Sequence, residues 1–246
     1  MAGSVSNGRE DRRLPLRFGA AAAGAALPYW AVSLAVAPGA SVAFRRWVLY
    51  RGPRTRPAVA LTFDDGPDPE YTARFLETLG SRRATFFAVG DRVRRWPELA
   101  RAVAGAGHEV ACHGDTHRHL AAMGPGRTRG ELLQARDTIG ELSGSPPRFY
   151  RPAYGVFNLA AWAEAPRLGM RRTLWSTWAR DWRADATPEL IASRTLAGAV
   201  PGAILLLHDS DGVPGAPART LRALPRILAG VEERGLELVT LSELVR

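Results

Sequence analysis

From residue 58 onward, short apolar runs alternate with amphipathic segments of helix length, and this alternation constrains the fold more than any other feature. The expected strands are 58–63, 84–89, 109–112, 148–151, 172–175, 203–207 and 237–239. The expected helices lie near residues 70–79, 97–106, 129–142, 158–168, 188–196 and 221–234. Because parallel strands need crossover connections, strict alternation predicts a parallel sheet. The pattern alone leaves open whether the units form an open doubly wound sheet or a barrel.

The composition fits one α/β domain preceded by an N-terminal extension. With 246 residues, of which 46% are hydrophobic, the chain is long enough to bury a full core. Cys112 is the sole cysteine, so no disulfide can form within the chain. All 33 basic residues are arginine, and the formal net charge is +9. Because these arginines are scattered rather than gathered in one tract, we expect no nucleic-acid partner, and nothing implies a protein partner.

Residues 18–44 carry no charged side chain and admit three interpretations. The length permits a membrane anchor, although Pro28, Pro38 and many glycines interrupt it. The segment also has the features of a secretory signal, and it could instead be a helix packed on the domain. We favour membrane association, with residues 1–52 as an extension and 53–246 as the α/β domain. The expected location is the cell envelope or a membrane, and the cytoplasm is the alternative. If the segment spans a membrane, the arginines that follow it would place the following domain in the cytoplasm.

Unusual polar residues fall at the carboxyl ends of the predicted strands, where both α/β architectures place functional groups. In strand order they are Asp64 and Asp65, then His113 and His117, then Arg151 and Tyr154, then Asp181 and Trp182, and finally His208 and Asp209. Independent surface residues would rarely be distributed in this way. The sequence therefore predicts a site at this edge of the sheet.

Two of these clusters indicate a metal. Adjacent carboxylates repel each other, so Asp64 and Asp65 are favoured beside a cation, and strand alternation is expected to turn their side chains apart. His113 and His117 are four residues apart, the spacing that puts two imidazoles on one side of a helical turn. Two histidines and one carboxylate leave positions open for water and substrate, as in a catalytic metal site. Zinc is the expected metal, with cobalt, nickel and ferrous iron as alternatives.

These residues resemble the motifs of the polysaccharide deacetylase family, carbohydrate esterases that share the NodB homology domain. The similarity runs from residue 58 to the C-terminus and comprises five motifs in the family's order. They are Thr-Phe-Asp-Asp-Gly-Pro at 62–67, His-Gly-Asp-Thr-His at 113–117, Arg-Pro-Ala-Tyr-Gly at 151–155, Arg-Asp-Trp at 180–182 and Leu-Leu-His-Asp at 206–209.

The resemblance implies a distorted seven-stranded (β/α) barrel and a division of roles. Asp65, His113 and His117 would bind one divalent metal. Asp64 would be the general base, and Arg151 would hold it in place. The physical chemistry agrees, since a carboxylate can take a proton from the attacking water.

The same resemblance assigns the rest of the site. His208 would be the general acid, tuned by Asp181. Tyr154 would offer its backbone N–H to the oxyanion, while Trp182 and Leu206 would wall a small acyl pocket. An imidazole paired with a carboxylate stays charged and oriented, and it can protonate an amide leaving group.

Some residues depart from the motifs or lie outside them. Gly114 stands where the family usually has Ser or Thr, and Ala153 replaces a common proline. His108 is expected to be structural at a turn between a helix and a strand. Trp175 and Trp178 are expected in the core or in the wall of the cleft.

The leading functional hypothesis is N-deacetylation of an N-acetylated sugar in a glycan or a lipid-linked precursor. The same machinery would also suit an O-deacetylase, a deformylase or another non-peptide amidohydrolase. A non-catalytic glycan-binding module is disfavoured, because binding alone needs no acid and no base. A hydrolase built on Ser210 and His208 is disfavoured too, since the sequence has no Gly-x-Ser-x-Gly elbow.

Overall fold

The computed structural model describes residues 47–212 and 214–246. The hydrophobic segment 18–44, with its three interpretations, lies outside the described residues. Among the helices of the described part, none has both the length and the apolar character needed to cross a membrane.

The described chain forms one parallel sheet. Its strands are β1 (Ala58–Asp64), β2 (Thr85–Ala88), β3 (Glu109–Cys112), β4 (Phe149–Tyr150), β5 (Arg171–Arg172), β6 (Thr177–Trp178), β7 (Ile204–His208) and β8 (Glu237–Val239). They are arranged in the order β5-β4-β3-β2-β1-β7-β6, with β8 paired to the first half of β1. Each predicted strand overlaps an observed one, and β6 is an additional strand that was not predicted.

The sheet curls into the distorted (β/α) barrel that was predicted. Its two ends are β5 and β6, which the short segment 173–176 joins without a helix. Within the described chain, no strand pairing links β5 to β6, so hydrogen bonding leaves the barrel open between them. This opening borders the site described below.

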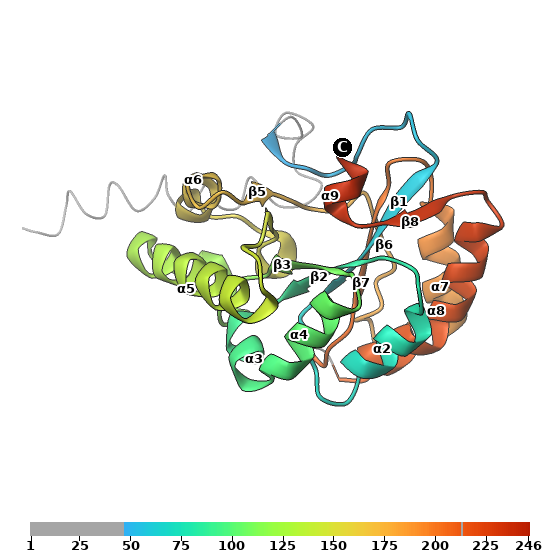
Figure 1. The fold of residues 1–246 in the computed structure, drawn as a ribbon, viewed down its shortest axis with the longest axis horizontal. Helices are drawn as coiled ribbons and strands as arrows, with labels where there is room; N and C mark the ends of the chain where they lie inside the picture. The colour runs from blue at the N-terminus through green and yellow to red at the C-terminus, as the bar shows by residue number, and fades with distance from the viewer. Residues whose placement is uncertain (1–46, 213) are drawn as a thin grey trace, which may run out of the picture.

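Helices cover the outer face of the curled sheet (Figure 1). The six predicted helices are present as α2 (Thr72–Leu79), α4 (Pro97–Gly105), α5 (Pro125–Ser143), α6 (Leu159–Arg167), α7 (Pro188–Ala197) and α8 (Ala216–Glu232). Two short helices, α3 (Gly90–Arg95) and α9 (Leu241–Leu244), were not predicted. Helices α7 and α8 pack together on one side of the sheet, and α5 and α6 pack together on the other.

Strand β1 is buried along its whole length, and its alternation positions the site. Leu61 and Phe63 point outward and pack in the cluster with helix residues such as Phe75. Ala60 belongs instead to the interior cluster. Because side chains two residues apart share a face, Thr62 and Asp64 also point into the barrel.

Candidate active site

Asp64 is held at the end of β1 by a buried arginine. Arg151, which is 0% exposed, donates to Asp64 Oδ1 (2.5 Å) and to Thr62 Oγ1 (2.9 Å). Its guanidinium lies 3.9 Å from the centre of the Phe87 ring and also donates to the Leu174 carbonyl (3.0 Å). Burial lowers the pKa of Arg151, and the nearby charge of Asp64 opposes that shift. The ion pair fixes the Asp64 carboxylate while leaving its second oxygen, Oδ2, near His113.

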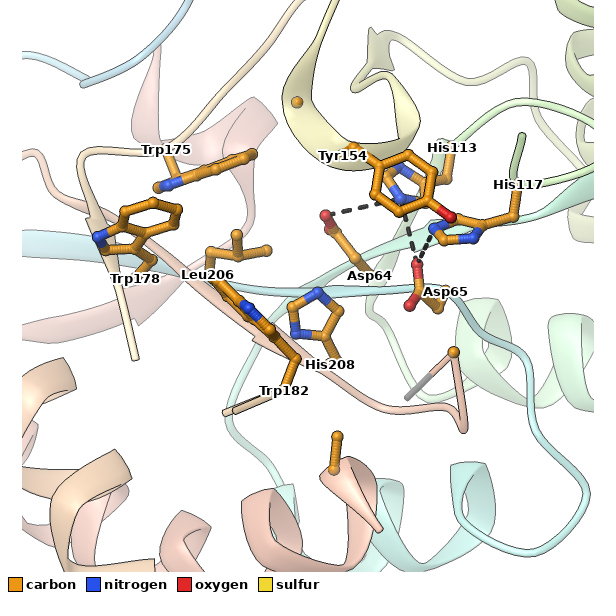
Figure 2. A pocket seen from close by; sticks show the side chains of 13 residues that line it. Asp64, Asp65, His113, His117, Tyr154, Trp175, Trp178, Trp182, Leu206 and His208 are labelled. Atoms are coloured by element: carbon orange, nitrogen blue, oxygen red, sulfur yellow. Dashed lines mark ion pairs between the residues drawn. The ribbon is translucent and has the colours of Figure 1, made fainter. Parts of the chain in front are cut away.

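Asp65 does not continue the alternation of β1, because the strand ends at Asp64. Its backbone is in the left-handed region, with φ of 83°. The prediction that the two carboxylates turn apart is therefore wrong in detail, since both line the same cavity (Figure 2). The turn at Asp65 brings the second carboxylate back toward the histidines.

His113 and His117 lie in an irregular loop after β3, not on the helical turn that their spacing predicted. Gly114, with φ of 92°, diverts the chain from a helix, and His117 itself has φ of 47°. A Ser or Thr at position 114 would be strained in this conformation, which accounts for the glycine. The two imidazole rings still converge, with centroids 5.3 Å apart.

Neighbouring elements fix this loop. Glu131 of α5 accepts hydrogen bonds from the Thr116 hydroxyl (2.7 Å) and amide (3.1 Å). Arg94 of α3 donates to both oxygens of the buried Asp115. These supports were not predicted, although Asp115 and Thr116 stand between the two histidines in the sequence. These hydrogen bonds hold His117 in position although the loop that carries it is not helical.

Three side chains form a group that could hold a metal ion. The ligand atoms of Asp65, His113 and His117 all lie within 4.8 Å of one another. Asp65 Oδ1 is 3.2 Å from His113 Nε2 and 2.9 Å from His117 Nε2 (Figure 2). His113 Nδ1 lies 2.8 Å from the Arg151 carbonyl. A carbonyl can only accept, so Nδ1 carries the proton and Nε2 of a neutral ring has a free lone pair.

The chemistry of Asp65 fits a cation. Burial raises its pKa, but the two histidines and the charge on His208 outweigh that effect and hold the pKa well below its usual value. Among the described residues, no hydrogen bond of normal geometry satisfies the buried Oδ1. An ionised, unsatisfied oxygen beside two imidazole nitrogens is the donor set expected of a two-histidine, one-carboxylate metal site.

His208 ends β7 opposite Asp64. Its Nδ1 lies 2.9 Å from Asp181 Oδ1, and its backbone N–H donates to Asp181 Oδ2 (2.8 Å). Asp181 is fully buried and also accepts from Thr220 Oγ1 (2.8 Å). Burial lowers the pKa of His208, but the charge and hydrogen bond of Asp181 outweigh it and raise the pKa to about 10.

The predicted site residues meet around one cavity of about 240 Å³. Trp182 and Leu206 line it beside His208, and the ring of Trp182 lies 5.4 Å from the imidazole. Tyr154, which is 58% exposed, covers the histidine side, and the centroid of its ring lies 5.1 Å from that of His117. Arg151 and Asp181 lie behind the lining and contact Asp64 and His208. Trp175 and Trp178 also line the cavity, as walls of the cleft.

Sequence reasoning noted Asp209 at a strand end but assigned it no role. The residue is 1% exposed and, within the described chain, neither carboxylate oxygen has a hydrogen-bond partner. Burial, together with the charges of Asp65 and Asp68, raises its pKa to about 8. Asp68 accepts from Ser210 Oγ (3.1 Å) and so ties the loop after β7 to the loop after β1. In the sequence, the only indication that Asp209 belongs near the site is its position directly after His208.

Comparison with known proteins supports the assignment. The sequence model described as "Polysaccharide deacetylase" matches residues 51–173. A peptidoglycan-N-acetylglucosamine deacetylase of Bacillus cereus is 34% identical over 204 residues, which cover 81% of this chain and 93% of that protein. A chitooligosaccharide deacetylase of Bradyrhizobium sp. is 37% identical over 202 residues, covering 76% and 90%. The crystal structure of a peptidoglycan N-acetylglucosamine deacetylase superposes with a TM-score of 0.78 at 27% identity, covering 83% of this chain and 96% of the other. The chain therefore belongs to the polysaccharide deacetylase family, and as an enzyme it is a hydrolase of that type.

Proposed function

We propose that this protein removes N-acetyl groups from an N-acetylated glycan, using one divalent metal held by Asp65, His113 and His117. The observation that carries the proposal is the convergence of this group with Asp64 and His208 around one cavity. The named relatives, which are deacetylases of peptidoglycan and chitooligosaccharide, support an amino-sugar substrate.

Zinc is the proposed metal, because neutral imidazole and carboxylate donors suit it. When bound, it would supply Lewis-acid activation of water and of the acyl oxygen. The structure supports the proposed ligands in two ways. His113 is oriented by the Arg151 carbonyl, and Asp65 Oδ1 already faces both Nε2 atoms.

Asp64 is the proposed general base. Its Oδ1 is occupied by Arg151, while Oδ2 lies 3.8 Å from His113 Nε2, on the side of the metal-binding group. That oxygen would take the proton of the attacking water. Arg151 is a positioning residue, because it acts through Asp64.

His208 is the proposed general acid. Asp181 engages Nδ1, so Nε2 is the ring nitrogen left to donate a proton to the departing amine. The pKa raised to about 10 keeps this proton available at neutral pH. Trp182 and Leu206 would hold the acyl group, and the backbone N–H of Tyr154 would bind the oxyanion.

The same residues could hydrolyse an ester, a formamide or the amide of a lipid-linked amino sugar. A paired, protonated imidazole favours the amide, because an amine leaves poorly without a proton. Mere glycan binding would not require Asp64 and His208 to face one cavity.

For the whole chain, we propose that residues 53–246 form the catalytic domain and that 18–44 associates the protein with a membrane of the cell envelope. The full-length protein should then sediment with membranes, and a shortened chain beginning at Arg51 should remain in the supernatant. Recovery of the full-length protein in the soluble fraction without detergent would contradict a membrane anchor.

The test of the function is acid release, identified by mass, from N-acetylglucosamine oligomers, peptidoglycan and lipid-linked amino sugars. Asp64→Asn should lower the rate by about 10²- to 10⁴-fold while the metal remains bound. His208→Ala should slow these amides more than it slows nitrophenyl acetate, because a good leaving group needs little protonation. Equal slowing of both substrates would exclude His208 as the general acid. The proposed function would be contradicted if the zinc-loaded protein released no acid from any of these glycans.

A further inference from the structure

The cavity extends below the level of the proton-transfer residues. In the sheet register, Asp64 of β1 is paired with His208 of β7. Leu206, two residues earlier on β7, is paired with Trp178 of β6. Paired residues of neighbouring strands point to the same face, as do residues two apart along one strand. Leu206 and Trp178 therefore form a layer roughly 6–7 Å deeper in the barrel than the Asp64–His208 layer.

Tryptophan rings continue this wall. The ring of Trp182, beside His208, lies 5.4 Å from that of Trp178, which in turn lies 5.9 Å from that of Trp175. In Figure 2, Trp175 and Trp178 lie beyond Leu206 on the side away from the metal-binding group. An apolar path thus leads away from the reacting atoms into the barrel.

The cavity reaches beyond the space around the metal-binding group. One continuous cavity of about 240 Å³ is lined by Asp65, His113 and His117 at one end and by Trp175, Trp178 and Leu206 at the other. The path also does not end at a closed wall. Trp178 is 38% exposed and lies on β6, a terminal strand at the opening of the barrel. A chain attached to the acyl carbon therefore has room to continue.

The chemistry of this deep part suits an alkyl chain better than a sugar. The described side chains that line it, Trp175, Trp178 and Leu206, present mainly hydrocarbon surface. Sugar hydroxyl groups buried there would lose water without gaining matching partners, at a large cost in free energy. An alkyl chain needs no hydrogen-bond partners. The sugar can stay at the mouth of the cavity, at the carboxyl ends of the strands.

We propose that the cavity accepts linear N-acyl groups longer than acetyl, with the distal carbons against Trp178 and Trp175. This inference rests on the proposed function, because it requires that the acyl group enter between Asp64 and His208. It changes the substrate class from N-acetyl sugars alone to short-chain N-acyl amino sugars.

The experiment uses the zinc-loaded full chain and glucosamine oligomers of one length that carry acetyl, propionyl, butyryl or hexanoyl groups. Since each methylene buried on an apolar wall can contribute about fourfold, kcat/KM for butyryl should equal or exceed that for acetyl. Trp178→Ala should lower the butyryl-to-acetyl ratio of kcat/KM by about tenfold. Trp96→Ala, at the junction of α3 and α4 outside the cavity, is the matched control and should leave the ratio unchanged.

A fall of tenfold or more from acetyl to propionyl in the unmodified protein would overturn the inference. So would a Trp178→Ala effect that depends on oligomer length instead of acyl length, because it would assign the ring to sugar stacking. Binding of acetate, butyrate and hexanoate, followed by tryptophan fluorescence, gives a measurement without turnover. Hexanoate should bind more tightly than acetate, and equal or weaker binding would contradict the inference. Absence of all hydrolysis would defeat the proposed function, whereas acetyl hydrolysis alone would defeat only this inference.

Discussion

Asp181 accepts two hydrogen bonds from His208, one from the backbone N–H at 2.8 Å and one from ring Nδ1 at 2.9 Å. The two bonds fix both the position and the protonation of the imidazole. Although burial favours the neutral ring, Asp181 raises the pKa of His208 to about 10. This pair is the clearest case in the site of a buried carboxylate that sets the chemistry of its neighbour.

Replacing Asp181 with asparagine should move the alkaline limb of the kcat/KM profile to lower pH. The amide lacks the negative charge that raises the pKa of His208, so the general acid loses its proton at lower pH. A shift of about one pH unit or more is expected, and a pH profile measures it. Asp185→Asn is the control, since Asp185 pairs with Arg183 at the surface. An unchanged limb in Asp181→Asn would contradict the proposed role.

Arg151→Ala should destabilise the metal-free protein by about 3–5 kcal/mol near neutral pH. The substitution leaves the buried Asp64 carboxylate without its cation. Denaturant unfolding measures the change. Arg82→Ala removes an exposed ion pair with Glu232 and should cost less than about 1 kcal/mol. Similar losses in the two variants would contradict this account.

Gly66→Ala should cost about 1–3 kcal/mol of stability through overpacking. A Cβ at Gly66 would clash with the Asp209 carboxylate, which is buried and cannot move away freely. Gly105→Ala is the matched control, because a Cβ at this position in α4 meets no atom within 4 Å. It should stabilise the helix by about 0.5–1 kcal/mol. Melting curves that shift in the same direction for both variants would contradict the packing seen at Gly66.

His108 should make stability depend on pH in the acid range. Burial, aided by the charge of Arg83, lowers its pKa from 6.5 to about 4, and Nδ1 accepts from the Ala84 N–H. The unfolded chain therefore binds a proton that the folded protein excludes. The stability that the neutral, buried His108 contributes is fully present above pH 6.5. It is lost as the pH falls toward 4, and the free energy of unfolding decreases by up to about 3 kcal/mol. Unfolding curves of His108→Gln should show a correspondingly weaker acid limb, and an identical limb would contradict the assignment.

The sequence predicted the strands well because hydrophobic alternation is a local property. β1 is one example, observed at Ala58–Asp64 against the predicted 58–63. The pattern did not predict α3, whose six residues include four charged side chains and whose N-cap residue, Val89, makes no capping bond. It also missed the two-residue strand β6, which depends on pairing with β7. Closure of the sheet depends on such long-range pairing and so could not be derived from periodicity.

The motifs predicted which residues meet at the site, but not how the backbone brings them there. His113 and His117 converge through a loop with positive φ at Gly114, and Asp65 turns inward through its own positive φ. The histidine loop is held by α3 and α5, through the bond that Arg94 donates to Asp115 and the bond that Glu131 accepts from Thr116. The deep tryptophan wall likewise depends on the register of β6, which the sequence did not reveal.

The central claim is that Asp65, His113 and His117 hold the metal on which hydrolysis depends. Its most direct test is calorimetric titration of the chelator-treated protein with zinc, followed by acetate release from an N-acetylglucosamine oligomer. The unmodified chain should bind one zinc ion and recover activity, while His113→Ala should lose both and remain folded. Asp64→Asn should still bind zinc but hydrolyse slowly. Stoichiometric zinc binding by His113→Ala, or hydrolysis by that variant after chelation, would contradict the account.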